Sequence, residues 1–165
     1  MSRAIFIVIF TLMCLTFLTE AVEKSYIQCK NSPGGSSNIR SLSITNCDVP
    51  PCILKKRNTV FVEEIFSVDK DVSKLTTKVS AKVFGVDLPF VSVDSTDACQ
   101  YLYNMDDTKA ACPLKAGGIY KYKNSFYIFD FYPNILTTVT WKLVDFSRGK
   151  PVNITCFQIE ARIKK

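Results

Sequence analysis

The side chains that could do chemistry in this chain are carboxylates, cysteines and hydroxyls, because its 165 residues include no histidine. Ser-His-Asp and Cys-His catalysis and histidine-ligated zinc sites are therefore excluded. Asp106 and Asp107 follow Asn104 closely, but their spacing does not fit an EF-hand calcium loop, and solvated loop carboxylates are the simpler interpretation. No pair of acids suggests the two carboxylates of a glycosidase. The sequence therefore predicts a protein that is not an enzyme and has no metal site or cofactor.

Cysteine is the residue type with the clearest pattern. Cys14 lies in an apolar N-terminal segment, and six cysteines remain after it. An even set of this kind in a secreted protein indicates three disulfides, and the absence of a CxxC motif argues against redox activity. The set consists of Cys29, Cys47, Cys52, Cys99, Cys112 and Cys156.

Loop lengths suggest how these cysteines pair. Cys47 and Cys52 flank the turn at residues 48–51, which can bring their Cα atoms within bridging distance. Cys99 and Cys112 would close a second local loop, which leaves Cys29 and Cys156 to join the first strand to the last. We expect the pairs Cys47–Cys52, Cys99–Cys112 and Cys29–Cys156.

The N-terminal segment has the pattern of a secretory signal peptide. Arg3 precedes an apolar run over residues 5–18, and Thr19-Glu20-Ala21 supplies small residues before a cleavage point. The run is shorter than the roughly 20 residues of a membrane span. We expect a signal peptide over residues 1–21 and one domain over residues 22–165, in a protein that is secreted or resides in the lysosomal lumen.

The formal net charge of +6 bears on partners. Excess lysine suits an anionic membrane surface, although ordinary solubility explains it equally well. Lys55-Lys56-Arg57 is the only basic triplet, which is too little for a nucleic-acid partner. Asn153-Ile154-Thr155 is the only N-glycosylation sequon, so Asn153 is the expected glycosylation site.

The segments that must position these side chains alternate apolar and polar residues with a period of two, which is typical of half-buried strands. Tyr120 and Tyr122 alternate with lysines, whereas the run 126–132 is apolar on both faces except at one aspartate. This run indicates burial on both sides or an inner face that lines a cavity. Glu63-Glu64 interrupts another apolar pattern, and a β-bulge is expected there.

About seven strands are expected, and no convincing helical period is present. Turn-forming residues separate them at a spacing typical of an all-β, immunoglobulin-like β-sandwich. The expected strands cover residues 22–29, 39–47, 59–68, 77–88, 119–131, 136–144 and 154–163.

Several short motifs, taken together in their order along the chain, resemble the ML (MD-2-related lipid-recognition) domain family. Within it the chain looks most like the Niemann-Pick type C2 sterol-transfer branch and its arthropod members. The motifs are Cys47-x4-Cys52 with Leu54, Leu88-Pro89-Phe90 before Cys99, Cys112-Pro113, Tyr132-Pro133, Trp141 and Cys156.

The resemblance implies the same three disulfides and a lipid cavity between the two sheets. It implies a secreted carrier of a sterol, a fatty acid, a semiochemical or another lipid, with an innate-immune binder of bacterial lipids such as lipopolysaccharide as the alternative. A monomer with transient contacts to anionic membranes or a lipid-accepting receptor is expected. A sandwich without a cavity, serving adhesion, is a third interpretation. The implied ligand-binding residues are Leu54, Leu88, Phe90, Ile128, Tyr132, Pro133, Val139, Trp141 and Phe157.

Overall fold

The computed structural model describes residues 26–29, 38–147 and 149–165, and the expected signal peptide lies outside these ranges. The described chain forms ten strands and one short 3-10 helix, η1 (Ala98–Tyr101). No helix among them is both long and apolar enough to span a membrane. The strands are β1 (Ile27–Gln28), β2 (Ile39–Ile44), β3 (Cys52–Lys55), β4 (Thr59–Ser67), β5 (Leu75–Val83), β6 (Val86–Pro89), β7 (Leu102–Tyr103), β8 (Ile119–Tyr127), β9 (Leu136–Asp145) and β10 (Val152–Lys164).

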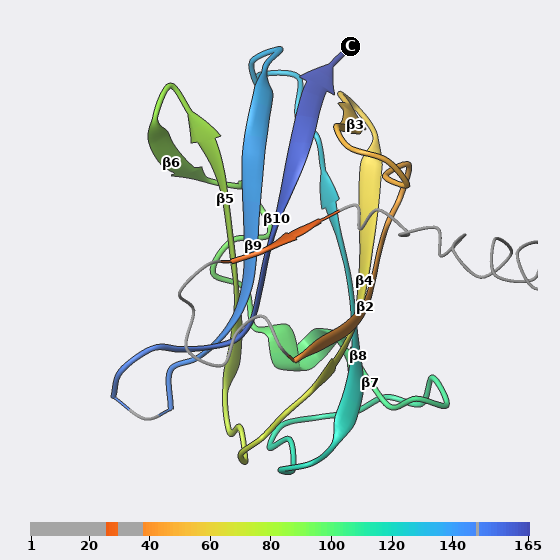
Figure 1. Ribbon diagram of the computed structural model, residues 1–165, viewed down its shortest axis with the longest axis vertical. Coiled ribbons are helices and arrows are strands. Elements are labelled where there is room, and N and C mark those ends of the chain that lie inside the picture. Colours follow the sequence, from red (N-terminus) through yellow and green to blue (C-terminus); the bar gives the residue numbers. More distant parts are fainter. Residues whose placement is uncertain (1–25, 30–37, 148) are drawn as a thin grey trace, which may run out of the picture.

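The strands form two sheets that face each other as a sandwich (Figure 1). The larger sheet has the order β1-β10-β9-β5-β6, with β3 paired in parallel to the end of β10. The smaller sheet has the order β2-β4-β8-β7. The expected immunoglobulin-like sandwich is therefore confirmed, and the inward residues of both sheets form one apolar core.

Two expected strand assignments need correction. The segment 77–88 is not one strand, because Phe84 and Gly85 adopt positive φ values of 49° and 84° and turn the chain from β5 into β6. The expected bulge at Glu63-Glu64 is wrong. Pairing between β4 and β8 is continuous from Thr59 to Ser67, so no extra residue is available to turn Glu64 outward. The strand keeps its period of two and buries Glu64.

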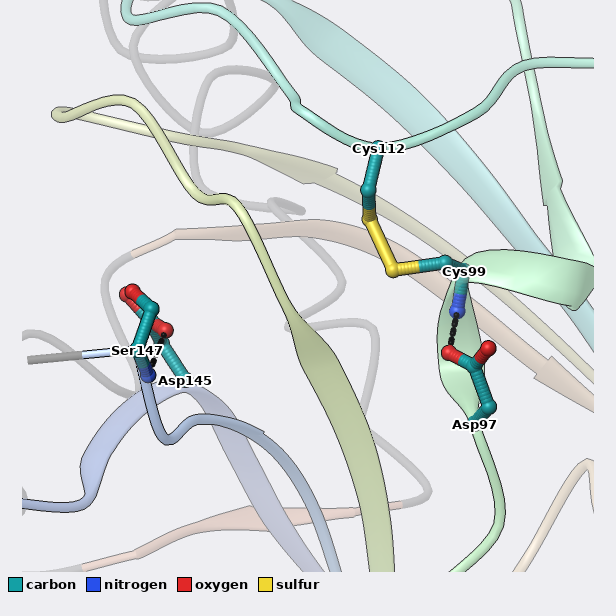
Figure 2. The surroundings of a disulfide bond; sticks show 5 residues. All are labelled: Asp97, Cys99, Cys112, Asp145 and Ser147. Atoms are coloured by element: carbon teal, nitrogen blue, oxygen red, sulfur yellow. Dashed lines mark hydrogen bonds between the residues drawn. A yellow bond between two sulfur atoms is a disulfide. The ribbon is translucent and has the colours of Figure 1, made fainter.

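The structure contains the three expected disulfides. The bridge between Cys29 and Cys156 joins the end of β1 to β10 across 127 residues of sequence. Cys99–Cys112 ties η1 to the segment that precedes β8, and the Asp97 carboxylate accepts a hydrogen bond from the Cys99 N–H at 3.0 Å (Figure 2). Both the long and the local connections of the sandwich are thus covalently fixed. The third bridge is Cys47–Cys52.

Candidate functional site

A chain of aromatic rings leads from the surface into the space between the sheets. Phe131, with 68% of its surface exposed, contacts Tyr132 with ring centroids 4.9 Å apart. Tyr132 lies 5.3 Å from Phe90, Phe90 lies 5.3 Å from Phe126, and Phe126 lies 5.7 Å from Trp141. Phe126 belongs to β8 of the smaller sheet and Trp141 to β9 of the larger one. The last contact therefore crosses the sandwich interior.

Strand register places the inner end of this chain. Val79 on β5, Trp141 on β9 and Phe157 on β10 are paired side by side, so all three face the smaller sheet. The Trp141 ring stacks on Phe157 with an angle of 8° between the ring planes. On the opposite sheet the Tyr122 ring lies 6.3 Å from Trp141 in an edge-to-face arrangement. Such aromatic contacts favour a rigid apolar wall.

At the outer end a hydrogen bond joins two connections of the chain. The Val91 N–H donates to the Tyr132 hydroxyl at 3.1 Å. Partial burial raises the pKa of the Tyr132 phenol, and the Val91 amide opposes this rise. Exposed apolar side chains lie on the β5–β6 hairpin, on the segment after it, on the β8–β9 connection and at the start of β9. The β5–β6 hairpin and the β8–β9 connection are both in the upper part of Figure 1. The exposed apolar side chains are Phe84, Val86, Leu88, Val91, Phe131 and Leu136.

Glu64 is the unexpected polar residue of the interior. It lies in the middle of β4, paired with Leu42 on one side and Tyr122 on the other, and its exposure is zero. Burial raises the pKa of Glu64 to about 8, and the nearby Thr155 hydroxyl opposes this rise. The Thr155 hydroxyl is within reach of the carboxyl, but the geometry between the two groups falls short of a hydrogen bond, and no other described residue bonds to either carboxyl oxygen. A buried carboxyl group without a partner is costly and calls for an explanation.

The neighbouring Tyr122 is satisfied, in contrast. Its hydroxyl forms a hydrogen bond of 2.7 Å with the Thr77 hydroxyl of the opposite sheet and accepts one of 2.6 Å from the Asn124 amide. Burial raises the pKa of Tyr122 well above its ordinary value. Trp141 Nε1 and Thr155 Oγ1 are two further buried polar atoms without a partner in the described chain.

The structure divides the nine expected ligand-binding residues into two groups. Tyr132 lies at the outer end of the aromatic chain, and Leu88 and Pro133 are exposed, so neither of these two belongs to the interior. The role of all nine residues in ligand binding stays a prediction. The remaining six lie in the common core: Leu54, Phe90, Ile128, Val139, Trp141 and Phe157.

Sequence reasoning missed three interior residues of this region: Tyr122, Phe126 and Glu64. The inward period of β8 would have pointed to Tyr122 and Phe126, because they share a face and both pack against Trp141. An uninterrupted period in β4 would have pointed to Glu64. The bulge expected there hid this signal.

The outer surface uses its carboxylates differently. Asp107 accepts hydrogen bonds from Lys121 and Lys123 at 2.8 Å each, which holds the pKa of its carboxyl near 2. Asp106 accepts two hydrogen bonds from Thr108. The described residues contain no cluster of three acidic or cysteine side chains that could hold a metal ion. Asn153, near the start of β10, is partly exposed, and its glycosylation stays a prediction.

Comparison with known proteins gives a consistent result. Residues 23–163 match the family model described as the ML domain. The chain is 27% identical to the ecdysteroid-regulated 16 kDa protein of Manduca sexta over 94% of this chain and 99% of that protein. It is 27% identical to an NPC intracellular cholesterol transporter 2 homolog of Drosophila melanogaster, over 92% and 95% of the two chains. A Niemann-Pick type C2 protein from the Japanese carpenter ant shares the fold, with a TM-score of 0.68 and 22% identity over 84% of this chain and 98% of that one.

Proposed function

Because this chain belongs to the ML-domain family, we propose that it is a lipid carrier that buries a sterol, a fatty acid or another apolar lipid between its two sheets and catalyses no reaction. The observation that carries this proposal is the unbroken chain of aromatic rings from Phe131 at the surface to Trp141 in the interior. Burying about 300 Å² of ligand surface at roughly 25 cal/mol per Å² gives about 7 kcal/mol before ordering costs are subtracted.

The outer end of the aromatic chain supports a route of ligand exchange. Phe90 and Tyr132 lie on two different connections, which their ring contact and the hydrogen bond from the Val91 N–H to the Tyr132 hydroxyl hold together. Water can replace either partner when the two connections part, so opening leaves no polar group unsatisfied. The exposed apolar side chains around this end would contact a membrane or a lipid-accepting receptor while the ligand moves. This end is therefore the proposed mouth.

Trp141 provides the experiment, because it is the only tryptophan of the chain. A fluorescent sterol or fatty acid that absorbs at the tryptophan emission wavelength should quench Trp141 when it enters between the sheets. Solvent extraction followed by mass spectrometry should identify lipid bound to the purified protein. Phe90→Ala should weaken probe binding about tenfold, or about 1.4 kcal/mol, whereas the exposed Phe61→Ala should leave it unchanged. Protein that yields no lipid and whose emission responds to neither probe would refute the carrier.

A basic turn beside the mouth favours a second candidate, the recognition of anionic bacterial lipids. The triplet Lys55-Lys56-Arg57 begins at the last residue of β3 and continues into the turn before β4, and the backbone N–H of Arg57 donates to the Ile128 carbonyl at 2.7 Å. The Arg57 guanidinium pairs with Asp130 at 2.7 Å, so an anionic headgroup would have to compete with that carboxylate. Competition between a sterol and lipopolysaccharide for the quenching of Trp141 separates the two candidates. Displacement of the sterol by lipopolysaccharide at lower concentration would favour immune recognition.

A further inference from the structure

Three buried polar groups at the inner end of the aromatic chain, with four oxygen and nitrogen atoms in all, make no hydrogen bond to the residues that the structure describes. They are the Glu64 carboxyl on β4, Thr155 Oγ1 on β10 and Trp141 Nε1 on β9. All three are buried, and they come from both sheets. Native interiors contain few such atoms, and each requires a reason.

Strand pairing brings the three groups into one layer of the sandwich. Glu64 pairs with Tyr122, whose ring lies 6.3 Å from Trp141 on the opposite sheet. Phe157 pairs with Trp141, and Thr155 is two residues from Phe157 on the same inward face of β10. Thr155 is also near enough to Glu64 to affect its titration. A ligand that follows the aromatic rings inward would meet these groups at its leading end.

The chemistry of the three groups defines what they can bind. Trp141 Nε1 only donates a hydrogen bond, and the Thr155 hydroxyl both donates and accepts. Burial raises the pKa of Glu64 to about 8, so its carboxyl is protonated at neutral pH and also offers one donor and one acceptor. A hydroxyl or carbonyl oxygen can satisfy such a set. Glu64 and Thr155 can pair with each other, so a hydrocarbon end would leave unpaired the Trp141 N–H and the donors and acceptors that this pair does not use.

We propose that Glu64, Thr155 and Trp141 form a polar inner end of the lipid site, and that the ligand is a lipid that enters with a hydroxyl or carbonyl group first. This inference rests on the proposed function, because it needs a lipid between the sheets. It assigns Glu64 a specificity role: the residue selects oxygenated lipids over hydrocarbons of the same length.

Matched probes test this inference. A long-chain alcohol, the corresponding ketone and the alkane of equal length are titrated into the full protein, with Trp141 emission as the readout. The wild type should bind the alcohol and the ketone at least about tenfold more tightly than the alkane. Glu64→Leu removes the carboxyl and fills the space with carbon, so it should lose this preference while binding the alkane at least as well. Glu64→Gln keeps a donor and an acceptor and should retain most of the preference.

Glu63 supplies the control, because it is the adjacent residue on β4 and its side chain lies on the outer face. Glu63→Gln should behave as the wild type with all three probes. The infrared band of the protonated Glu64 carboxyl, missing in Glu64→Gln, should shift when the alcohol binds and stay unchanged with the alkane. This second readout does not depend on the affinity of any variant.

The outcomes separate the two proposals. Equal binding of alcohol and alkane by the wild type, or an equal preference in the wild type and Glu64→Leu, would overturn the polar inner end and leave the lipid carrier intact. An infrared band that does not respond to the bound alcohol would mean that Thr155 or an internal water, not the ligand, satisfies Glu64, and would overturn the polar inner end. Absence of binding of every probe would overturn the carrier and this inference with it.

Discussion

The two faces of the β4–β8 ladder treat the same residue type in opposite ways. Glu63 faces outward, and its carboxylate lies 3.4 Å from Lys123. Glu64 is the next residue and faces inward, where it has no hydrogen-bond partner among the described residues. The backbone of both residues pairs with β8 in one continuous register. The difference therefore comes from the face and not from residue type or strand position.

The pKa values on the two faces differ in the same sense. On the outer face two lysine ammonium groups hold the pKa of Asp107 near 2, because they stabilise its charged form. On the inner face, loss of solvent raises the pKa of Glu64 to about 8, because burial penalises the charged form. Charge pairing governs the outer face, whereas packing and desolvation govern the inner face. The ligand-binding role that we propose belongs to the inner face.

The largest expected effect comes from removing one aromatic ring from each face. Phe126 on β8 is 3% exposed, whereas Phe61 on β4 is 60% exposed. Phe126→Ala should lower the unfolding free energy of the lipid-free protein by about 3 to 5 kcal/mol, because it leaves a cavity beside Trp141. Phe61→Ala should change it by less than about 0.5 kcal/mol. Chemical denaturation measures both, and similar losses would abolish the distinction between the faces.

The pH dependence of stability should reveal Glu64. Its pKa is about 8 in the folded protein and near 4.5 when unfolded, so its contribution is fully present below about pH 4.5 and is lost as the pH rises to about 8. The unfolding free energy should fall on the order of 3 kcal/mol between pH 5 and pH 8. Tyr122 is the titratable group that faces Glu64, and its raised pKa keeps it protonated in this range.

Two variants test whether Glu64 causes the fall in unfolding free energy between pH 5 and pH 8. Glu64→Gln removes the only group on the inner face of β4 that titrates, so its unfolding free energy should lose this fall between pH 5 and pH 8. Glu63→Gln should retain the slope of the wild type, because Glu63 is exposed to solvent and paired with Lys123. A slope that survives in Glu64→Gln would show that another group titrates on folding.

Local sequence signals predicted much of the fold. Period-two alternation marked the long strands, and the even set of cysteines marked the three bridges, because both patterns reflect short-range geometry. The short strand β3 was not predicted, because its four residues pair with β10 more than a hundred positions later. The alternation of apolar and polar residues also could not show that β6 lies outside the core. All four of its residues are exposed, and Leu88 is 47% exposed.

The site was harder to predict than the fold. Six of the expected residues lie in the core because apolar residues on inward positions of strands are buried in any sandwich. Glu64 was not predicted as an interior residue because burying a carboxyl group is energetically unfavourable. A β-bulge that turns the side chain to solvent was therefore the expected local structure. Regular pairing of Glu63 and Glu64 with both neighbouring strands decides the matter, and this information is distributed over β2 and β8.

A smaller effect should follow from Tyr122→Phe on the inner face. The change removes the hydroxyl that bonds Thr77 and Asn124, and it leaves the Thr77 hydroxyl buried without that partner. We expect a loss of about 1 to 3 kcal/mol in unfolding free energy. Tyr127→Phe, at an exposed position of β8, is the matched control and should be close to neutral. Equal losses in both variants would mean that the buried hydroxyl adds nothing specific.

The smallest effect is expected for Asp107→Asn on the outer face. Asp107, Lys121 and Lys123 are linked by contacts of 2.8 Å, but the Asp107 carboxylate is exposed to solvent, and exposed ion pairs contribute little. Because folding lowers the pKa of Asp107, its contribution is present above the unfolded value of about 3.9 and is lost as the pH falls through about 2. At neutral pH, thermal melts of the variant and the wild type should nearly coincide, and about 1 M salt should remove any difference. Asp106→Asn, which affects only the local turn with Thr108, is the control. A destabilisation by Asp107→Asn as large as that by Tyr122→Phe would mean that charge pairing on the outer face stabilises the ladder as strongly as the buried hydrogen bonds of the inner face.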